Sequence, residues 1–582
     1  MKQVCQKQLF FLILYFFLGV CLYSSFSYAP DGRPSLSTYG SGLSQGPILR
    51  HLHLAERERK TSMTLVFAAQ YGRTFKSEKI AHLLFRTAWL PITGSAVPDR
   101  DNKHDLLADY FGLPRDFKSI MHFRPVISEF NLSIDGLMGV DALVEGLFWG
   151  FHVPIKSTKW ELNMHEQVID AGTAFHPAGY MGPERIERPA LAPNASMALH
   201  GQMISPLSGQ VVPLRYGDMQ DPLSFGVFEN RSEKVGFGDI RLMSGWKKQY
   251  DWSHAGLLSV VFLPTSNRRT GELYLQPLLG NGKHWEMGGG FTGHVDLFKQ
   301  HEGARSLGIY VDALFTHIFP AWEKRCFNLS HLGLANRYML LEELSSIGYQ
   351  GRLSPLVNKM SLAARIDVVI RADITAKFVY VHDAINVEVG YNFLANTHER
   401  LKGHGTFDGG RYALKGDAQV YGFHHYTDSP QAVTATQHLS YLNRGQIPGN
   451  TTYQQIYGPF LRTAFENINA DAPIAVVPDL YQVNSADSVA LDPLDPLPQA
   501  PIYESVNPIL VQDADVDYEG ALFPKSLSHR FFVHVSKLFS AEDALVKPSL
   551  GFGFLVETAG TSYATNSAIS KWGLAINGSL YW

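Results

Sequence analysis

Cysteine is scarce in this sequence: 582 residues contain three. Two of them, Cys5 and Cys21, lie before residue 28 and would leave with a signal peptide, so Cys326 would stand alone. A single cysteine excludes an internal disulfide and a zinc site made of cysteines. Small domains held together by disulfides are therefore excluded as a class.

Long hydrophobic runs are also scarce. The one clear run, Leu9–Tyr23, follows Lys2 and Lys7 and precedes the small residues Ser25 and Ser27. This order is typical of a secretory signal, and the run is short for a membrane-spanning helix. We predict a cleaved signal peptide over 1–27 and an N-terminal segment over 28–60. The remaining chain contains no run that would form a transmembrane helix.

Charge is sparse and nearly balanced. Charged residues make up 18% of the chain, below the usual value of about 25%. The formal net charge of −4 is small for this length and argues against nucleic acid as a partner. Aromatic residues reach 12%. Such a chain can still reside in a membrane as a β-barrel, whose apolar residues are spread over alternate positions.

Strict alternation is the main feature that is present. In RIDVVIRADITAKF, Arg365–Phe378, polar and apolar residues alternate with one break at Val369. A period of two indicates a β-strand, since successive side chains point to opposite faces. The stretch is longer than an ordinary strand of about 5–6 residues and suits a tilted strand that crosses a bilayer. An outer strand of a soluble β-sandwich is the alternative for this stretch alone.

The same alternation recurs along the chain, for example in 63–71, 285–297, 385–393 and 550–557. We predict an all-β protein: one antiparallel transmembrane barrel over 61–582 with about 14 strands, within a range of 12–16. Four long loops are expected, at about 76–118, 170–234, 320–360 and 442–525. Barrels place long loops on one rim, but the strands recognised here do not bring all four to the same rim.

A short helix is expected near 102–112. Asp101 is a candidate N-cap, Leu106, Leu107, Tyr110 and Phe111 form an apolar stripe, and Gly112 would end the helix. A helix packed on the rim and a plug inside the barrel are both open interpretations.

The C-terminal strand carries a resemblance. In KWGLAINGSLYW, Leu574, Ile576, Leu580 and the terminal Trp582 share one face. This ending resembles the final strand of bacterial outer-membrane β-barrel proteins, which the barrel-assembly machinery reads. Gly578 departs from the hydrophobic series, and no subfamily is identified. The resemblance implies the outer membrane of a Gram-negative-type bacterium as the location, with membrane lipid and the assembly machinery as partners.

Charged residues on the polar faces are the candidate lumen lining, because a charge facing lipid would cost about 2–4 kcal/mol near the bilayer centre. The proposed lumen-lining residues are Asp239, Arg241, Arg365, Asp367, Arg371, Asp373, Lys377, Glu388, Lys415 and Asp417. Acidic and basic residues are nearly balanced among them, which predicts weak ion selectivity.

The function that these features favour is a porin-like channel for passive diffusion of small hydrophilic solutes. A surface-exposed adhesin and a plugged transporter of apolar compounds are the alternatives. No HExxH motif occurs, and no enzyme activity, cofactor or metal site is predicted. An outer-membrane hydrolase stays an open alternative that no recognised motif supports. Porin-like barrels often form homotrimers, so the resemblance leaves a homotrimer open.

Overall fold

The structure is a computed structural model. It describes residues 63–97, 105–141, 143–176, 181–182, 185–300, 305–330, 335–345, 348–423, 430–436, 480–483, 511–539, 546–560 and 566–582. The predicted signal peptide and the segment 28–60 lie outside the described residues.

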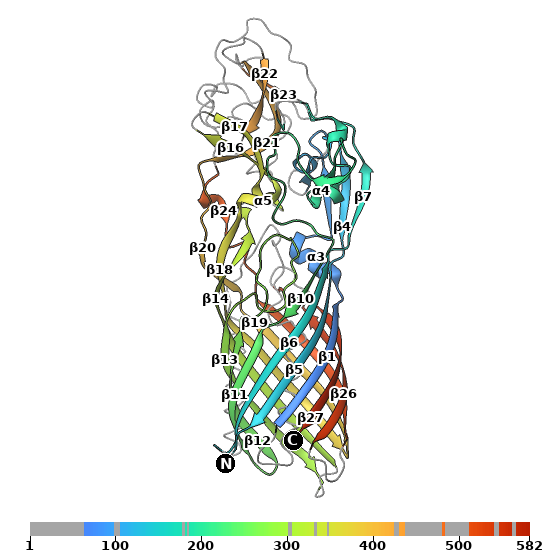
Figure 1. The fold of residues 1–582 in the computed structure, drawn as a ribbon, viewed down its shortest axis with the longest axis vertical. Helices are drawn as coiled ribbons and strands as arrows, with labels where there is room; N and C mark the ends of the chain where they lie inside the picture. Colours follow the sequence, from blue (N-terminus) through green and yellow to red (C-terminus); the bar gives the residue numbers. More distant parts are fainter. Residues whose placement is uncertain are drawn as a thin grey trace.

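Twelve antiparallel strands form a closed barrel (Figure 1). Each pairs with two neighbours, and the pairing of the last strand with the first closes the ring. In order around the barrel they are β1 (Met63–Thr74), β5 (Val126–Gly139), β6 (Leu147–Glu161), β11 (Ile240–Gln249), β12 (Ser253–Leu263), β13 (Glu286–Lys299), β14 (Arg305–Cys326), β18 (Ser361–His382), β19 (Ile385–Asn396), β25 (Ser526–Leu538), β26 (Lys547–Ala559) and β27 (Lys571–Tyr581). Two further strands extend this sheet, β10 (Arg231–Phe237) beside β6 and β20 (Glu399–His404) beside β18. The predicted antiparallel barrel is confirmed, and twelve strands fall within the expected range.

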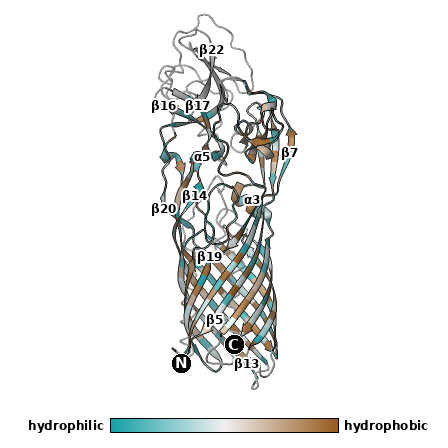
Figure 2. Cartoon of the chain, in the orientation of Figure 1, coloured by the Kyte–Doolittle hydropathy of each residue, from teal (hydrophilic) through white to brown (hydrophobic). Residues whose placement is uncertain are grey.

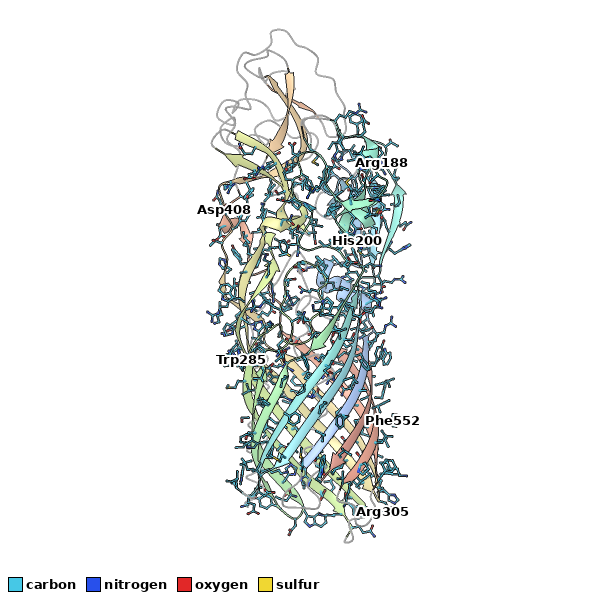
Figure 3. All side chains as sticks on the ribbon, in the orientation of Figure 1. Arg188, His200, Trp285, Arg305, Asp408 and Phe552 are labelled. Atoms are coloured by element: carbon cyan, nitrogen blue, oxygen red, sulfur yellow. The ribbon has the colours of Figure 1, made fainter. Side chains whose placement is uncertain are left out.

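The two-residue period sorts side chains between the two faces of the wall. In β18, Phe378 is 52% exposed on the outer face, whereas its neighbour Lys377 is buried inside. Figure 2 shows hydrophobic and hydrophilic residues alternating along the barrel strands. In Figure 3, Phe552 of β26 projects from the outside of the wall. The outer surface is therefore apolar, as a barrel surrounded by lipid requires.

Exposed aromatic side chains occur near both rims. Tyr250 and Trp252 flank the turn between β11 and β12, and Trp285 lies at the other end of the wall beside Phe319. Amphipathic aromatic rings are typical of the two membrane–water interfaces of such barrels. Their position indicates where the membrane boundaries cross the wall.

All the long connections leave the barrel at the same rim, and the short turns lie at the other rim with the C-terminus (Figure 1). The sequence-based assignment failed to bring the long segments to one rim because it omitted β5, β6 and β12. Adding these three strands, and removing 412–420, which belongs to a separate sheet, restores the alternation of long and short connections that antiparallel barrels require.

The long segments are not plain loops. They form a layer above the barrel, here called the cap, that contains short strands and helices (Figure 1). Its helical elements are α3 (Ser77–Phe85), η3 (Ala108–Phe111), η4 (Arg188–Ala190), α4 (Ala195–Leu199), η5 (Asn336–Tyr338), α5 (Leu356–Lys359) and η8 (Asp513–Asp515). Its strands are β2 (Trp89–Thr93), β3 (Leu106–Leu107), β4 (Lys118–Phe123), β7 (Met164–Asp170), β8 (Gln202–Ile204), β9 (Val211–Pro213), β15 (Asn328–Leu329), β16 (Leu340–Ser345), β17 (Gly348–Pro355), β21 (Tyr412–Phe423), β22 (Pro430–Thr436), β23 (Leu480–Val483) and β24 (Val516–Asp517).

The cap has its own hydrophobic core. Leu84 of α3, Phe228, Leu341 of β16 and Leu522 are buried in one cluster, although each belongs to a different long connection. Burial of such side chains stabilises a fold by about 1.5–3 kcal/mol each relative to exposure. The cap is therefore a packed unit and not a set of independent loops.

Two segments differ from their sequence-based interpretation. The expected helix near 102–112 is a strand, β3, followed by the single 3₁₀ turn η3, and Tyr110 and Phe111 pack in the cap core, not in the barrel as a plug. Asp101 lies outside the described residues. The segment 320–360 is not a loop throughout, since β14 continues to Cys326 and β16 and β17 follow. Most of 442–525 lies outside the described residues.

Candidate functional site

The interior of the barrel is lined by charged side chains. On β18, Arg371, Asp373 and Lys377 alternate along the inner face, and each is at most 5% exposed. Burial of this extent means that other side chains in the lumen cover them. The inner face of β18 is therefore covered by side chains from other strands.

An ion pair bridges the wall near the cap end of the barrel. Arg371 Nη1 of β18 donates to Glu286 Oε1 and Oε2 of β13 at 3.1 and 3.0 Å. Thr316 Oγ1 on the strand between them also donates to Glu286, at 2.5 Å. Asn281 adds a further donor from the connection before β13. Glu286 is thus bonded from three separate segments while fully buried.

A second group lies nearer the opposite rim. Lys377 Nζ donates to Glu388 Oε2 of β19 at 3.0 Å. His534 of β25 lies 3.7 Å from Glu388 Oε1, and its Nε2 is 2.6 Å from Asn577 Oδ1 of β27. These side chains join four strands of the wall, β18, β19, β25 and β27, and the last contact spans β26.

A third group joins β25, β26 and β27. Arg530 Nη2 donates to Glu557 Oε2 at 2.9 Å, and Ser528 Oγ donates to Glu557 Oε1 at 2.7 Å. Lys571 Nζ lies 3.8 Å from Glu557 and 3.9 Å from Glu129 of β5. Buried pairs of this kind need both partners, because one charge alone would carry the full desolvation cost.

Arg241 of β11 connects the two sides of the lumen electrostatically. Its Cα pairs with that of His152 on β6, and His152 Nδ1 lies 2.5 Å from Asp135 Oδ1 on β5. Arg241 is also within Coulombic range of Asp373 and Glu286, which belong to strands farther around the barrel. Arg241 therefore lies between the His152–Asp135 pair and the Arg371–Glu286 pair.

Several buried polar atoms that face the lumen have no hydrogen-bond partner among the described residues. They are Thr64 Oγ1, Gln70 Oε1, both amide atoms of Asn131, His152 Nε2, Arg241 Nε and Nη2, Thr292 Oγ1, Ser536 Oγ, Asn577 Nδ2 and Ser579 Oγ. A buried polar atom without a partner costs about 1–3 kcal/mol. Water or a polar solute entering the lumen would satisfy these groups.

Hydrogen bonds join different cap connections to one another above the cap-side mouth of the barrel. Tyr274 Oη, from the connection between β12 and β13, donates to Leu84 O in α3 at 2.9 Å. Lys79 of α3 donates to Gly560 O, in the connection between β26 and β27, at 2.6 Å. Burial, with Lys76 nearby, lowers the pKa of Lys79 to about 8. These contacts tie connections that start from different parts of the rim.

Of the ten predicted lining residues, five face the lumen, one lies at its cap-side mouth and four lie elsewhere. Arg241, Arg371, Asp373, Lys377 and Glu388 face the lumen and are buried there. Asp239 lies at the cap-side mouth, where its carboxylate accepts the amide N–H groups of Ser266 and Asn281 at 3.2 and 2.5 Å.

The remaining four predicted residues do not line the barrel. Arg365 is exposed, while Ile366 is buried in the cap core. The pairing of β14 with β18 shifts register between Thr316 and Ala321, opposite this stretch, so the alternation changes face near Val369. Asp367 is buried in the extension of β18 beyond the barrel, where Arg400 Nε donates to it at 2.9 Å.

Lys415 and Asp417 belong to β21, which pairs with cap strands and not with the barrel. Lys415 is fully buried there, and the side chain of Asp417 lies outside the described residues. The alternation of 412–420 indicated a strand correctly, but alternation alone does not say to which sheet a strand belongs.

Important lumenal residues were absent from the sequence-based set. Asp135 and Asn131 were missed although Phe130, Leu132 and Ile134 alternate with them, so the period-two signal was available in β5. His152 was harder to find, because β6 combines aromatic residues, glycine and proline without a clear period. Glu286 lies on the polar face of 285–297, where the alternation was recognised, but it was not included in the lining set.

The residues of the proposed assembly signal lie on the outer face of β27. Leu574 and Ile576 are exposed, and Trp582 follows the strand with its N–H donating to Met63 O at 2.9 Å. That bond joins the end of the last strand to the start of the first. A role in recognition by the assembly machinery stays a prediction.

Deleting Trp582 is expected to reduce sharply the amount of folded barrel in the membrane fraction, because the closing strand loses its terminal aromatic and one bond to β1. Folded barrel can be measured by its heat-modifiable migration on gels. Phe539→Ala removes an exposed aromatic near the same rim and serves as the control. Normal assembly of the deletion variant would refute the assembly role.

Other kinds of site were sought in the part of the chain that the structure describes. No cluster of three or more His, Cys, Asp or Glu residues there is arranged to hold a metal ion. No helix among these residues is long and apolar enough to span a membrane.

No protein-family model matches the chain. No curated protein matches it. Among solved structures, the fold is similar to an outer membrane channel from Pseudomonas putida F1, with 9% identity, a TM-score of 0.31 and coverage of 91% of this chain and 98% of that one. A FadL homologue from Pseudomonas aeruginosa is 7% identical, with a TM-score of 0.24 and coverage of 91% of each chain. OprB from Pseudomonas putida is 8% identical, with a TM-score of 0.18 and coverage of 96% of this chain and 100% of that one.

At these TM-scores the likeness carries no argument about function, and the assignment rests on the strand pairing and the apolar outer wall of this chain. The chain is a closed, twelve-stranded antiparallel β-barrel with an apolar outer wall, and no subfamily is identified.

Proposed function

We propose that this protein is an outer-membrane channel for small hydrophilic solutes, which is closed in the present structure and opens when lumenal ion pairs rearrange. The observation that carries the proposal is the buried network of charged side chains on the inner wall. A barrel needs only an apolar outer face to remain in the membrane, so a charged interior indicates a path for polar compounds.

The closed lumen carries an energetic imbalance that favours opening to water. Its ion pairs hold the wall residues together, but atoms of Asn131 and Arg241, among others, have no partner among the described residues. Entry of water or a polar solute would supply those hydrogen bonds. This supports a two-state lumen and not a rigid plug.

An apolar solute fits this interior less well. It would separate charges such as Arg371 and Glu286 from each other or from water without replacing their interactions. The polar lining therefore favours a hydrophilic solute over the transport of apolar compounds.

Both signs of charge occur on the inner wall, as in Arg530 with Glu557 and Lys377 with Glu388. Selectivity for ions of one sign arises from rings of one sign of charge. We therefore expect weak selectivity. The rim with the cap is proposed to face the cell exterior, since long connections of such barrels lie on that side.

The test is single-channel recording of the mature chain refolded in a planar lipid bilayer. We expect brief, small current steps with a reversal potential near zero across a salt gradient. A strongly displaced reversal potential would refute balanced charge along the path. Absence of any current from folded and inserted protein would refute the channel.

The cap favours a second candidate, a surface-binding protein in which the barrel serves as an anchor. Its separate hydrophobic core, to which several long connections contribute, is the observation behind it. This candidate predicts no current from inserted protein, and no current after the lumenal ion pairs are removed. The same recording therefore discriminates between the two candidates.

A further inference from the structure

An arginine is buried in the cap without an acidic partner. Arg337 lies in η5, is 1% exposed and ranks among the largest fully buried side chains of the described residues. Its Nε and Nη1 atoms have no hydrogen-bond partner there, and no ion pair to it is found among the described residues. Ala335, two residues earlier, has φ 59°, a conformation rare for a residue with a side chain, so packing holds this turn in place.

The groups around Arg337 supply no negative charge. Its guanidinium lies 5.6 Å from the centre of the Tyr274 ring. Burial raises the pKa of Tyr274 to about 12, although Arg337 acts in the opposite direction. Burial also raises the pKa of Tyr338 and of the Cys326 thiol. All three neighbours are therefore neutral at neutral pH.

The Tyr274 ring near this charge belongs to a group of aromatic residues. It stacks with Phe85 at 5.0 Å and with Phe228 at 4.8 Å between ring centres, and Tyr338 lies 5.3 Å from Phe228. These four residues are here called the aromatic cluster. Interaction with one tyrosine face stabilises a cation by about 0.5–2 kcal/mol, which is less than the cost of removing an unpaired charge from water.

A second buried arginine in the same region, Arg325, has the acidic and carbonyl partners that Arg337 lacks. Arg325 donates through Nη1 and Nη2 to Glu399 at 2.7 and 2.8 Å, and through Nη1 to Ala521 O at 2.6 Å. Arginine does not lose its proton in proteins. Arg337 therefore keeps its charge in a setting that offers none of the partners that Arg325 has.

We propose that Arg337 and the aromatic cluster form a binding site for a small organic carboxylate. A carboxylate matches the planar guanidinium and supplies the missing negative charge. Its apolar body suits the aromatic cluster. A phosphate dianion is a poorer fit, because its greater charge is more costly to remove from water. The site is independent of the proposed channel, since it lies in the cap.

Binding can be measured by titration calorimetry on the full mature chain in detergent, with sodium benzoate, sodium acetate and sodium phosphate as probes. We expect benzoate to bind more tightly than acetate, because acetate lacks a body to contact the rings, and phosphate to bind least. Arg337→Met keeps side-chain bulk and removes the charge. It should weaken benzoate binding by at least about 30-fold, a typical loss for one partner of a buried charge pair.

Arg411→Met is the matched control. Arg411 is another cap arginine, but it is exposed and pairs with Glu343. Its replacement should leave benzoate binding unchanged. Without a probe, Arg337→Met should be as stable as the wild type or more stable, because it removes an uncompensated buried charge. If that variant does not fold, Arg337→Lys can be used instead. It keeps the positive charge but lacks the paired N–H donors of the guanidinium, so it should still weaken benzoate binding.

Three outcomes would overturn the proposal. One is a folded wild type that binds no carboxylate. Another is benzoate binding that survives both Arg337 substitutions. The third is phosphate or chloride binding as tight as that of benzoate, which would identify a general small-anion site. Loss of channel current would leave the proposal standing, because the two sites are tested separately.

Discussion

Replacing Glu286 and Arg371 together by serine is expected to raise the ratio of open to closed recording time about tenfold. The pair joins β13 to β18 across β14, and both side chains fill the lumen. Their joint removal creates space without leaving a charge unpaired. If the pair stabilises the closed lumen by about 1.4 kcal/mol, its loss changes the ratio of open to closed states about tenfold.

The single substitutions should behave differently. Arg371→Ser leaves Glu286 buried with neutral donors only, and breaking a buried pair in this way costs about 3–5 kcal/mol. We therefore expect the single variants to lose stability of the folded barrel, and the double variant to retain it. Single-channel recording and the heat-modifiable gel shift separate the two effects.

A double variant at an exposed pair provides the control. Arg231 and Glu233 of β10 lie 3.7 Å apart and are largely exposed, so replacing both by serine should leave conductance unchanged. If the Glu286 and Arg371 double variant is folded, inserted and no more conductive than the wild type, the lumenal pair does not close the channel.

The sequence predicted those parts of the structure that depend on local alternation. Lys377 inside and Phe378 outside follow from a period of two, and the C-terminal strand closes the barrel as its apolar face suggests. The change of face near Val369 was not predictable, because the register shift arises from pairing with β14 and leaves no mark in β18 other than one interrupted alternation.

The contacts between lumenal charges could not be predicted for a different reason. The sequence places charges on inner faces but does not say which of them meet. Arg371 and Glu286 are 85 positions apart, and Lys571 reaches Glu129 across the junction of the last and first parts of the chain. Only the order of strands around the barrel brings these groups together.

The cap was underestimated because its elements are short. Strands of two to eight residues, such as β3 and β17, give too few periods to recognise. Their stability comes from packing between different connections, as for Phe85 against Tyr274, and not from local preference. Arg337 illustrates the same limit, since an arginine is expected to be exposed and only the folded cap buries it.

The second large effect concerns the joint between the barrel and the cap. Glu399→Gln is expected to destabilise the cap by about 1–3 kcal/mol, because Arg325 keeps its ion pair with Glu323 but loses a second carboxylate that accepts two of its N–H groups in a fully buried site. Glu399 also accepts the N–H of Phe523 at 2.9 Å, so β14, β20 and the segment before β25 depend on this one side chain.

Hydrogen exchange of the backbone amides would locate the loss. Faster exchange is expected in β20 and around Phe523, while β26 and β27 of the membrane barrel should keep their protection, because their ladder does not involve Glu399. Glu343→Gln is the matched control: it makes the same chemical change opposite an exposed arginine, Arg411, and should cost at most about 1 kcal/mol. If both variants exchange alike, the buried joint contributes no more than an exposed ion pair, and the cap must be held to the barrel by its apolar core instead.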